Sequence, residues 1–514
     1  MNKYTLLICL LGILLLSGCQ ADEAPTATEA PTVTEDSLEA TFVSISTQAA
    51  IYASTQQHHR YATQTFLAEL ALTPSPTATD SGILDPETEP LDGEGPWLAF
   101  IDYRKLWIMN HDGRGNKILI PNVRSILASP DGRMLAYIVL GEDDDPDLNI
   151  LSLPENRILL SMDIYNFELE DLDFILDDSI RNSNYAEDLW YAVGDFAWSP
   201  DSSMLAFTSS HESPSSDVYM YDTRNGEVIR LTSGLSQAIH PIWSPDGRYI
   251  FHAGVDRLHI GASGAGYTGW KLFSVTPDGR NNHLYDGIGE ATGYEDVLGW
   301  LSDRTILMNS GHWWCGYFDL RTMNIETGNI QPIWRGNHDS AAYSSEYASI
   351  LVGASEFDKF DEGCGPEEES GLFLISTANN SRTRLLDDVG WYWIGWSNEG
   401  RRFIVDSETL GFFTVDGTGN IEYLDGRPFF APGGEYWLIK STGIYDDSEL
   451  VKRLSIKSYN YVFWSPDGQS VYFEDDGALY RASTPGFEPE VIKPLSFDGI
   501  HDYAWIIPDL EGED

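Results

Sequence analysis

Acidic, histidine and aromatic side chains share one position ahead of an aromatic residue that recurs along the chain. Asp195, His240, Trp393 and Asp502 each lie three residues before such an aromatic. Equivalent positions in a repeated unit come together when the units form a ring. Carboxylates and an imidazole gathered in this way can transfer protons or hold a ligand, although such a histidine more often only makes a structural hydrogen bond. We predict that these four residues line the mouth of a central channel.

A second group consists of aromatic residues in predicted loops. It comprises Trp313, Trp314, Tyr317, Tyr267 and Trp270. Aromatic side chains in exposed loops stack on sugar rings or pack against protein side chains. These residues therefore form a predicted binding face, and the alternative is that they cover the rim of the core.

Alternating acids in one segment resemble the beginning of a calcium-binding loop. Asp143, Asp145 and Asp147, followed by Asn149, supply the oxygen ligands that calcium prefers. Leu148 stands where such a loop needs glycine, and no glutamate occupies the twelfth position. A solvated acidic loop is the alternative, and we expect no other metal or cofactor.

Several catalytic signatures are absent from the sequence. The G-x-S-x-G pentapeptide of α/β-hydrolases does not occur, and Gly261-Ala262-Ser263-Gly264-Ala265 departs from it at the last position. The sialidase box, a phosphate-binding loop, H-E-x-x-H and C-x-x-C are missing as well. With 80 acidic against 31 basic residues the net charge is −49, which repels nucleic acid. The sequence therefore favours a binding protein over an enzyme.

The elements that must position these residues are built from one repeated phrase. Trp243-Ser244-Pro245-Asp246-Gly247 and Trp464-Ser465-Pro466-Asp467-Gly468 are complete copies, and near copies begin at Ala128, Trp198 and Trp396. Proline presets φ, aspartate caps the turn and glycine takes the left-handed position, so each phrase predicts a tight turn after a strand. The repeated aromatic is best explained as a contact between neighbouring units. Copies of one short β unit must stack to bury their cores, which predicts a β-propeller.

Strands that end in the phrase, or in a degenerate form of it, define nine units. The phrase aromatics or their equivalents are Ala128, Trp198, Trp243, Trp300, Tyr343, Trp396, Phe430, Trp464 and Trp505. The segment 97–121 holds outer strands without an inner one, and the strand at 503–506 lacks outer strands, so the two predict one shared blade that closes the ring. Propellers usually have four to eight blades. We therefore expect an all-β propeller of eight or nine four-stranded blades, with the Phe430 unit as the candidate embellishment.

The repeats resemble a known family. Units that read W-S-P-D-G, strand, D-V-Y-M-Y-D, N-G, R-L-T are similar to the WD-like repeats of TolB-type β-propellers. The resemblance covers roughly residues 97–509 and is strongest in 194–285 and 460–492. It implies an extracytoplasmic propeller, in a group that mostly binds other proteins.

The first residues resemble the export signal of a bacterial lipoprotein. Lys3 precedes an apolar run from Thr5 to Leu16 that is too short to span a membrane comfortably. Leu16-Ser17-Gly18-Cys19 resembles a lipobox, in which the cysteine carries lipid and becomes the mature N-terminus. We expect a lipid anchor at Cys19, and a location in the cell envelope on the extracytoplasmic side of a bacterial membrane. An ordinary signal peptide or an uncleaved anchor is the alternative.

Composition divides the chain into five segments. They are a signal peptide (1–18), a disordered tether (19–36), a stalk helix (37–72), a linker (73–95) and the propeller (96–509), which contains a partly helical insertion (163–193). The tether and linker are rich in Thr, Pro and acids and cannot bury a core. The stalk has a heptad pattern with a polar middle, so a self-associating helix and a frayed monomeric helix both stay open.

Two cysteines remain for the exported domain, Cys315 and Cys364, because Cys9 belongs to the signal peptide. An even pair in an oxidising compartment predicts a disulfide. Their spacing from Trp300 and Tyr343 places both in or beside the loop between the second and third strands of adjacent units. A bridge there is geometrically reasonable, and two free thiols are the alternative.

Long insertions fall between the second and third strands of a unit and between units, and in a propeller these connections share one face. Connections on the other face are short and uniform. Long loops on a rigid scaffold are where binding is normally built. We therefore predict a surface-tethered lipoprotein whose long-loop face binds a protein or a cell-envelope polysaccharide. The alternative is an exported glycan hydrolase or lyase, with carboxylates and histidine at the channel mouth.

Overall fold

The computed structural model describes the propeller with gaps. The described residues are 95–111, 117–141, 146–153, 157–165, 194–212, 215–233, 237–255, 257–261, 264–268, 271–285, 295–312, 316–354, 370–387, 392–397, 400–446, 449–457, 461–496 and 499–507. All of them belong to the second of the two units into which the chain divides, Asp80–Asp514. Within these ranges every regular element is a β-strand, and no helix exists that could cross a membrane.

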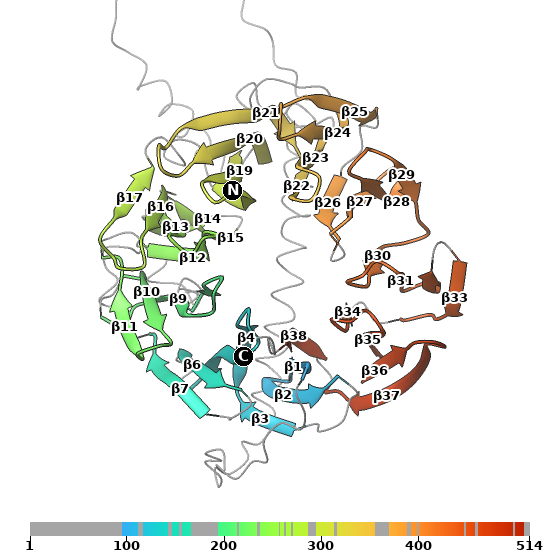
Figure 1. Cartoon of the computed structure of the whole chain (residues 1–514), viewed down its shortest axis with the longest axis horizontal. Helices are drawn as coiled ribbons and strands as arrows, with labels where there is room; N and C mark the ends of the chain where they lie inside the picture. Colours follow the sequence, from blue (N-terminus) through green and yellow to red (C-terminus); the bar gives the residue numbers. More distant parts are fainter. Residues whose placement is uncertain are drawn as a thin grey trace, which may run out of the picture. The chain divides into compact units, whose positions relative to one another are not determined.

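Nine four-stranded antiparallel sheets follow one another around a ring (Figure 1). From the inner strand outward, blade 1 is β38 (Ile500–Ile506), β1 (Trp97–Asp102), β2 (Lys105–Asn110) and β3 (Lys117–Pro121); blade 2 is β4 (Val123–Ala128), β5 (Met134–Leu140), β6 (Pro146–Ser152) and β7 (Arg157–Asp163); blade 3 is β8 (Phe196–Trp198), β9 (Met204–Ser209), β10 (Asp217–Asp222) and β11 (Glu227–Arg230); blade 4 is β12 (Gln237–Trp243), β13 (Ile250–Val255), β16 (Lys271–Val275) and β17 (Asn282–Tyr285). A two-stranded hairpin, β14 (Arg257–Gly261) and β15 (Gly264–Thr268), is inserted between β13 and β16.

The remaining five blades have the same strand order. Blade 5 is β18 (Glu295–Ser302), β19 (Thr305–His312), β20 (Gly316–Asn324) and β21 (Ile330–His338); blade 6 is β22 (Ser340–Ser344), β23 (Ser349–Ala354), β24 (Gly371–Ser376) and β25 (Arg382–Leu386); blade 7 is β26 (Tyr392–Trp396), β27 (Arg402–Ser407), β28 (Gly411–Asp416) and β29 (Ile421–Tyr423); blade 8 is β30 (Pro428–Phe430), β31 (Tyr436–Ile439), β32 (Gly443–Asp446) and β33 (Glu449–Arg453); blade 9 is β34 (Val462–Trp464), β35 (Ser470–Asp475), β36 (Ala478–Ser483) and β37 (Glu488–Pro494). The predicted all-β propeller is confirmed, at the upper of the two expected blade numbers.

Blade 1 closes the ring as the sequence predicts. Strand β38, from the C-terminal end of the propeller, pairs antiparallel with β1, in a register that runs from Trp97 opposite Ile506 to Phe100 opposite Tyr503. Strand β1 pairs with β2 on its other side. Because the first and last parts of the propeller share one sheet, β1 is paired on both sides and is not an edge strand.

The Phe430 unit is a full blade, so its interpretation as an embellishment was wrong. In the complete phrase, Ser465 N–H donates to the Ser470 carbonyl, and Gly468 N–H donates to the Ser465 carbonyl. The segment after Phe430 makes the same two bonds, from Ala431 to Tyr436 and from Gly434 to Ala431. The backbone geometry of the turn therefore survives although the serine and aspartate of the phrase are lost.

Serine and aspartate of the phrase hold each complete turn together. In blade 4 the Ser244 hydroxyl donates to the Asp246 carboxylate at 2.7 Å and accepts the Tyr249 N–H at 3.0 Å. The Asp246 carboxylate also accepts the Arg248 N–H at 3.2 Å. The serine hydroxyl makes the corresponding two bonds in blades 2, 3 and 9, at Ser129, Ser199 and Ser465. These polar residues are thus accounted for by turn formation.

The phrase tryptophans pack between blades, as predicted, and those of blades 3, 4 and 9 make a hydrogen bond across the seam. The indole N–H of Trp243 donates to the Ala197 carbonyl of blade 3 at 2.9 Å. Trp198 makes the equivalent bond to Leu127 at 3.2 Å, and Trp464 makes it to a carbonyl of blade 8 at 2.8 Å. In each case the acceptor directly precedes the phrase aromatic, or its equivalent, of the preceding blade. The tryptophan therefore fixes the register between neighbouring inner strands.

An apolar cluster fills each of the nine seams between neighbouring blades in the described part of the chain. The seam between blades 9 and 1 is closed by fully buried Leu98, Phe100 and Tyr472. The cluster between blades 7 and 8 has the fewest buried members, namely Ile404, Phe430, Trp437 and Ile439. Stability is therefore distributed around the ring, and that seam relies most on other contacts.

The turn aspartates make stability depend on pH. Burial raises the pKa of Asp246, but hydrogen bonds from Ser244 and Arg248 outweigh it and hold the pKa below its ordinary value. A carboxylate with a depressed folded-state pKa stabilises the protein above the pKa of the unfolded chain, near 4, and loses this contribution as pH falls through the folded-state pKa. We expect Asp246→Asn to lower the free energy of unfolding at pH 7 by about 0.5–1.5 kcal/mol. Urea unfolding at pH 7 and pH 3 should show that the difference from wild type shrinks in acid; an unchanged difference would contradict the assignment.

Candidate binding face and channel mouth

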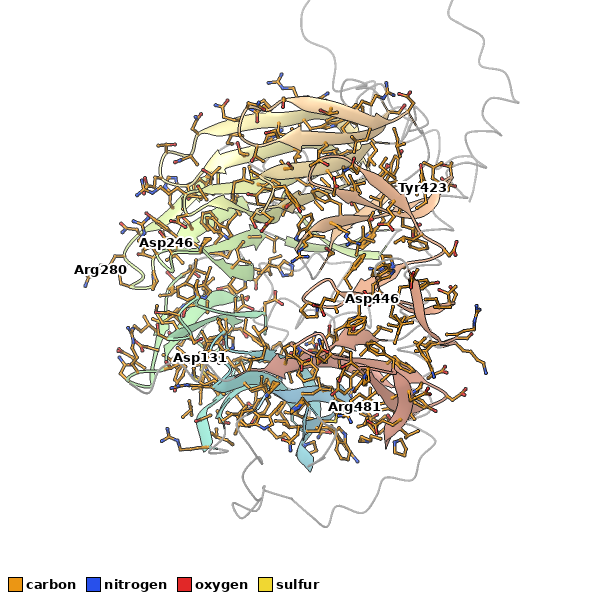
Figure 2. The ribbon with its side chains drawn as sticks, turned by 45° about the vertical axis from the view of Figure 1, so that its right-hand side comes forward. Asp131, Asp246, Arg280, Tyr423, Asp446 and Arg481 are labelled. Carbon is orange, nitrogen blue, oxygen red and sulfur yellow. The ribbon has the colours of Figure 1, made fainter. Side chains whose placement is uncertain are left out.

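The strand order assigns every connection to one of two faces. Inner strands end at the phrase turns, so the turns between first and second strands and between third and fourth strands share one face, called here the turn face. Asp131, Asp246 and Arg280, labelled in Figure 2, belong to such turns in blades 2 and 4. Connections between second and third strands, and between blades, lie on the other face, called here the elaborated face. The predicted assignment of long connections to this face is confirmed.

Two of the predicted insertions differ from expectation. The segment between β13 and β16 was predicted to be an irregular loop, but it contains the β14–β15 hairpin. In blade 5, where a long loop between the second and third strands was expected, β19 continues to His312 and β20 begins at Gly316, so the two strands form a long hairpin. The predicted helical insertion lies almost wholly outside the described residues.

The predicted aromatic binding group is described only in part. Tyr267 lies in β15 and Tyr317 lies in β20, both within hairpins that reach the elaborated face. Trp270, Trp313 and Trp314 lie outside the described residues. The backbone placement agrees with a binding role for the two tyrosines, and that role stays a prediction.

The cysteine and calcium predictions also fall mostly outside the described residues. Cys315 and Cys364, like Cys19, are not described, and their segments connect second and third strands of the adjacent blades 5 and 6. Asp143 and Asp145 are not described either, while Asp147 lies in β6 opposite Val139. Among the described residues no group of three His, Cys, Asp or Glu side chains is placed to hold a metal.

Asp195 and His240 meet at the channel mouth. The Asp195 carboxylate lies 2.9 Å from His240 Nδ1 and also accepts the His240 backbone N–H at 3.1 Å. These contacts join blades 3 and 4 and accompany a left-handed backbone at His240, with φ of 52°, beside a bulge in β12. Such strain in a non-glycine residue persists only where its surroundings hold it. The His240 ring stays 68% exposed, so the pair orients an imidazole that solvent or a ligand can reach.

The other two predicted channel residues do not join this pair. The Asp502 carboxylate accepts the Ile126 N–H of blade 2 at 3.1 Å, and burial raises its pKa despite this bond. Trp393 lies under the guanidinium of Arg427, 4.4 Å from its Cζ atom, at the seam between blades 7 and 8. The predicted site is therefore three separate contacts around the ring. The four residues therefore do not converge on a single site, although Asp195 and His240 contact each other.

A shared structural role explains several polar residues at this position. Three carboxylates each accept a backbone N–H from the inner strand of the next blade, namely those of Asp195, Asp502 and Asp339. The Asp339 carboxylate accepts the Tyr392 N–H at 3.2 Å. Ser340, three residues before Tyr343, accepts the Ile394 N–H at 3.1 Å. Sequence reasoning missed Asp339 and Ser340 because the phrase of their unit is degenerate. These contacts connect neighbouring inner strands at the elaborated face.

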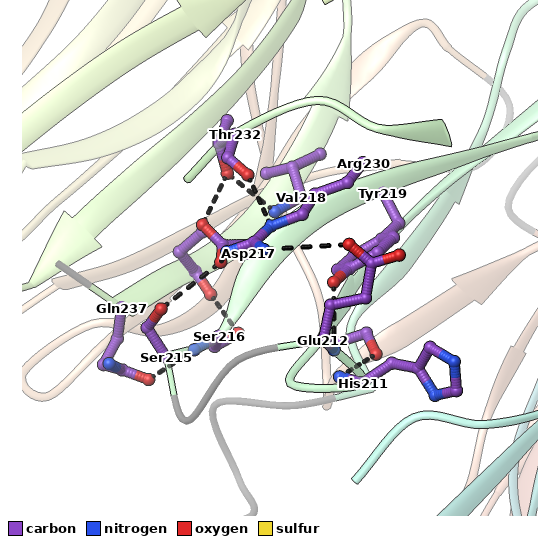
Figure 3. Close-up of polar contacts among 12 residues, drawn as sticks. His211, Glu212, Ser215, Ser216, Asp217, Val218, Tyr219, Arg230, Thr232 and Gln237 are labelled. Atoms are coloured by element: carbon purple, nitrogen blue, oxygen red, sulfur yellow. Dashed lines mark hydrogen bonds and ion pairs between the residues drawn. The ribbon is translucent and has the colours of Figure 1, made fainter. Parts of the chain in front are cut away.

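A buried polar network lies on the elaborated face of blade 3 (Figure 3). Asp217, 2% exposed, contacts Arg230 Nη2 at 2.5 Å and accepts the Thr232 hydroxyl at 3.0 Å. Arg230 also reaches Glu212 at 3.7 Å. Because both charges of the central pair are partnered, the network can stay buried. It fastens the loop between β9 and β10 to the outer strand.

The same network continues into blade 4. The Ser216 N–H donates to Gln237 Oε1 at 2.7 Å, and the Ser216 hydroxyl donates to the Ala238 carbonyl at 2.8 Å. Asp217 and Arg230 are the first residue of the D-V-Y-M-Y-D strand and the arginine of R-L-T, so the segments that carry the family resemblance are the ones that connect the blade. The chain is a nine-bladed β-propeller.

A peptidase is among the curated proteins whose sequences resemble this chain. Dipeptidyl-peptidase 5 of Porphyromonas gingivalis is 24% identical over 206 residues, which are 37% of this chain and 28% of that protein. The chain therefore spans little more than a quarter of this relative. No family model matches the chain.

Comparison with solved structures gives matches of low sequence identity. A eukaryotic initiation factor superposes with a TM-score of 0.51 at 12% identity, covering 81% of this chain and all of that one. TolB from Acinetobacter baumannii covers 56% of this chain and 63% of its own, at 17% identity and a TM-score of 0.29. At these identities the likeness concerns the fold alone.

Proposed function

We propose that the propeller is a binding module that presents its elaborated face to a protein or to a cell-envelope polysaccharide, and that a lipid on Cys19 tethers it to the envelope. The observation that supports this most is the asymmetry of the two faces. The turn face consists of short connections that the phrase residues hold together, whereas the elaborated face carries the long connections. Variable loops on a rigid scaffold are where recognition is built.

The path of the chain supports the same orientation. Trp97, where β1 begins, is opposite Ile506 at the turn face. There the Ile507 carbonyl lies so close to the Gly132 backbone that a Cβ at this glycine would be 2.1 Å away. The chain thus enters the propeller on the turn face, which is the face opposite the elaborated one.

An exported enzyme is the less supported alternative. Asp195 and His240 form a contact between two blades, and Asp502 and Trp393 lie at other seams. The relative that is a peptidase is matched over 28% of its length, and its activity is therefore not transferred to this chain.

A test of the binding face replaces Trp313 and Trp314 together by alanine. We expect capture of the envelope partner by the immobilised protein to fall at least tenfold, because tryptophans are frequent hot spots of protein interfaces, each worth about 2 kcal/mol or more. Arg280→Glu, an exposed change on the turn face, is the matched control and should not affect capture. Loss of capture in the control and not in the double variant would overturn the assignment of faces.

The tether has its own test. Cys19→Ala should move the protein from the membrane fraction to the soluble fraction, because removing the acylation site removes the lipid anchor. Immunoblots of the two fractions measure this, and an unchanged membrane fraction would contradict a lipid anchor at Cys19.

A further inference from the structure

Two cations face each other at the channel mouth between blades 7 and 8. Pro428 of β30 is paired with Ile439 of β31, and the next residues outward in this register are Arg427 and Lys440. Their charged groups lie over the same ring: Arg427 Cζ is 5.9 Å and Lys440 Nζ is 5.4 Å from the centre of Phe429. Like charges directly opposite each other on paired strands are destabilising. This arrangement is therefore unexpected as a purely structural one.

An indole holds the arginine in place. The guanidinium of Arg427 lies 4.4 Å from the centre of the Trp393 ring, a cation–π distance. Trp393 in turn folds back over Gly395, where a Cβ would lie 2.6 Å from the indole. Only a glycine two residues along the strand leaves room for this ring. A stacked guanidinium keeps its N–H donors in one plane at its edge, where they match a carboxylate.

The electrostatic setting is unusual for this chain. The protein has a net charge of −49, yet none of the ion pairs recorded for the described residues involves Arg427. Burial lowers the pKa of Lys440, and the positive charge of Arg427 lowers it further. Glu474, the acid whose charge favours the Lys440 cation, accepts the Ile500 N–H of β38. An anion at this point would give the exposed guanidinium of Arg427 a counter-charge.

We propose that Arg427 and Lys440, with Trp393 and Phe429, form a binding site for a carboxylate at the channel mouth. The planar donors of Arg427 bind both carboxylate oxygens, and Lys440 supplies a second positive charge. The partly exposed rings of Trp393 and Phe429 contact the carbon skeleton attached to the carboxylate. The site needs none of the loop tryptophans, so it goes beyond the proposed macromolecular binding.

The test uses small probes on the full chain. Two carboxylates, glucuronate and N-acetyl-dialanine, represent an acidic sugar and a peptide C-terminus, and glucose and the dialanine amide are their neutral counterparts. Inorganic phosphate is a fifth probe. Saturation-transfer NMR titrations at constant ionic strength measure binding of each probe.

Variants assign the binding to the site. We expect at least one carboxylate to bind, its neutral counterpart to fail, and Arg427→Gln or Lys440→Gln to weaken binding about tenfold or more, as loss of a charged hydrogen bond implies. Arg402→Gln is the matched control, because Arg402 stacks on Phe430 at 4.9 Å on the turn face of the same seam and lies 4.0 Å from Glu422. It should bind like wild type.

Each result of these titrations either supports or contradicts the proposed carboxylate site. The probe that binds identifies an acidic sugar or a peptide terminus as the source of the carboxylate. Binding of neither carboxylate, binding of phosphate alone, or unchanged carboxylate affinity in Arg427→Gln would overturn the proposal. Melting curves of each variant verify folding, and Arg427 is exposed, so its loss should not unfold the protein. Capture of a macromolecular partner is a separate measurement, so either proposal can fail without the other.

Discussion

A chain truncated after Gly499 is expected to lose the cooperatively folded propeller. This change removes β38, the inner strand of blade 1, together with its pairing to β1. Ile500 and Ile506 are fully buried, and each such side chain stabilises a fold by about 2–5 kcal/mol. The truncation also exposes Leu98 and Phe100 and leaves β1 as an open edge. The destabilisation should therefore exceed that of any single substitution, and size-exclusion chromatography and thermal melting should show aggregation or an early, broad transition.

A peptide with the sequence of residues 499–507 provides the control for this truncation. Added in excess, it should pair with β1 and restore the sharp transition, since it supplies the missing hydrogen bonds and apolar side chains. A truncated protein that melts like wild type without the peptide would show that ring closure contributes little.

Trp243→Ala is expected to lower the free energy of unfolding by about 3–5 kcal/mol, the usual cost of removing a large buried aromatic side chain. Trp243 is 7% exposed at the seam between blades 3 and 4. Trp243→Phe should cost about 1–3 kcal/mol, because it keeps most of the apolar contact but leaves the Ala197 carbonyl without its indole donor. Urea unfolding monitored by circular dichroism measures both values.

Tyr423→Ala is the matched control for the tryptophan series. Tyr423 is an aromatic residue on the outer strand β29 and is 57% exposed, so its removal should change stability by less than about 0.5 kcal/mol. Equal destabilisation by Trp243→Ala and Tyr423→Ala would contradict the seam role of the phrase tryptophan.

The repeated phrase made the fold predictable because its residues act locally. Proline, aspartate and glycine specify a turn over a few residues, and the tryptophan before them makes the same contact at the seams of blades 3, 4 and 9 with the blades before them. The error at Phe430 came from judging that unit by its side chains. Gly434 still adopts a left-handed φ of 74°, and the backbone bonds of the turn are kept.

The candidate sites were harder to predict because they depend on which strands become neighbours. The register places Asp195 beside His240, but Asp502 and Trp393 belong to other seams. Nothing local in the sequence links Arg427 to Trp393, since a seam between two blades brings them together. The pattern around the ring predicts equivalent positions, and the chemistry at each position follows from its own neighbours.

The double pairing of β1 has a mechanical consequence. Strand β1 is hydrogen-bonded along its length to β2 on one side and to β38 on the other. A pull on the polypeptide ahead of Trp97, directed along the strand, would load both ladders in shear at the same time, so many bonds would have to break together. A protein attached by that end would thus resist extraction by force better than one whose first strand lay at an edge and could be peeled off bond by bond.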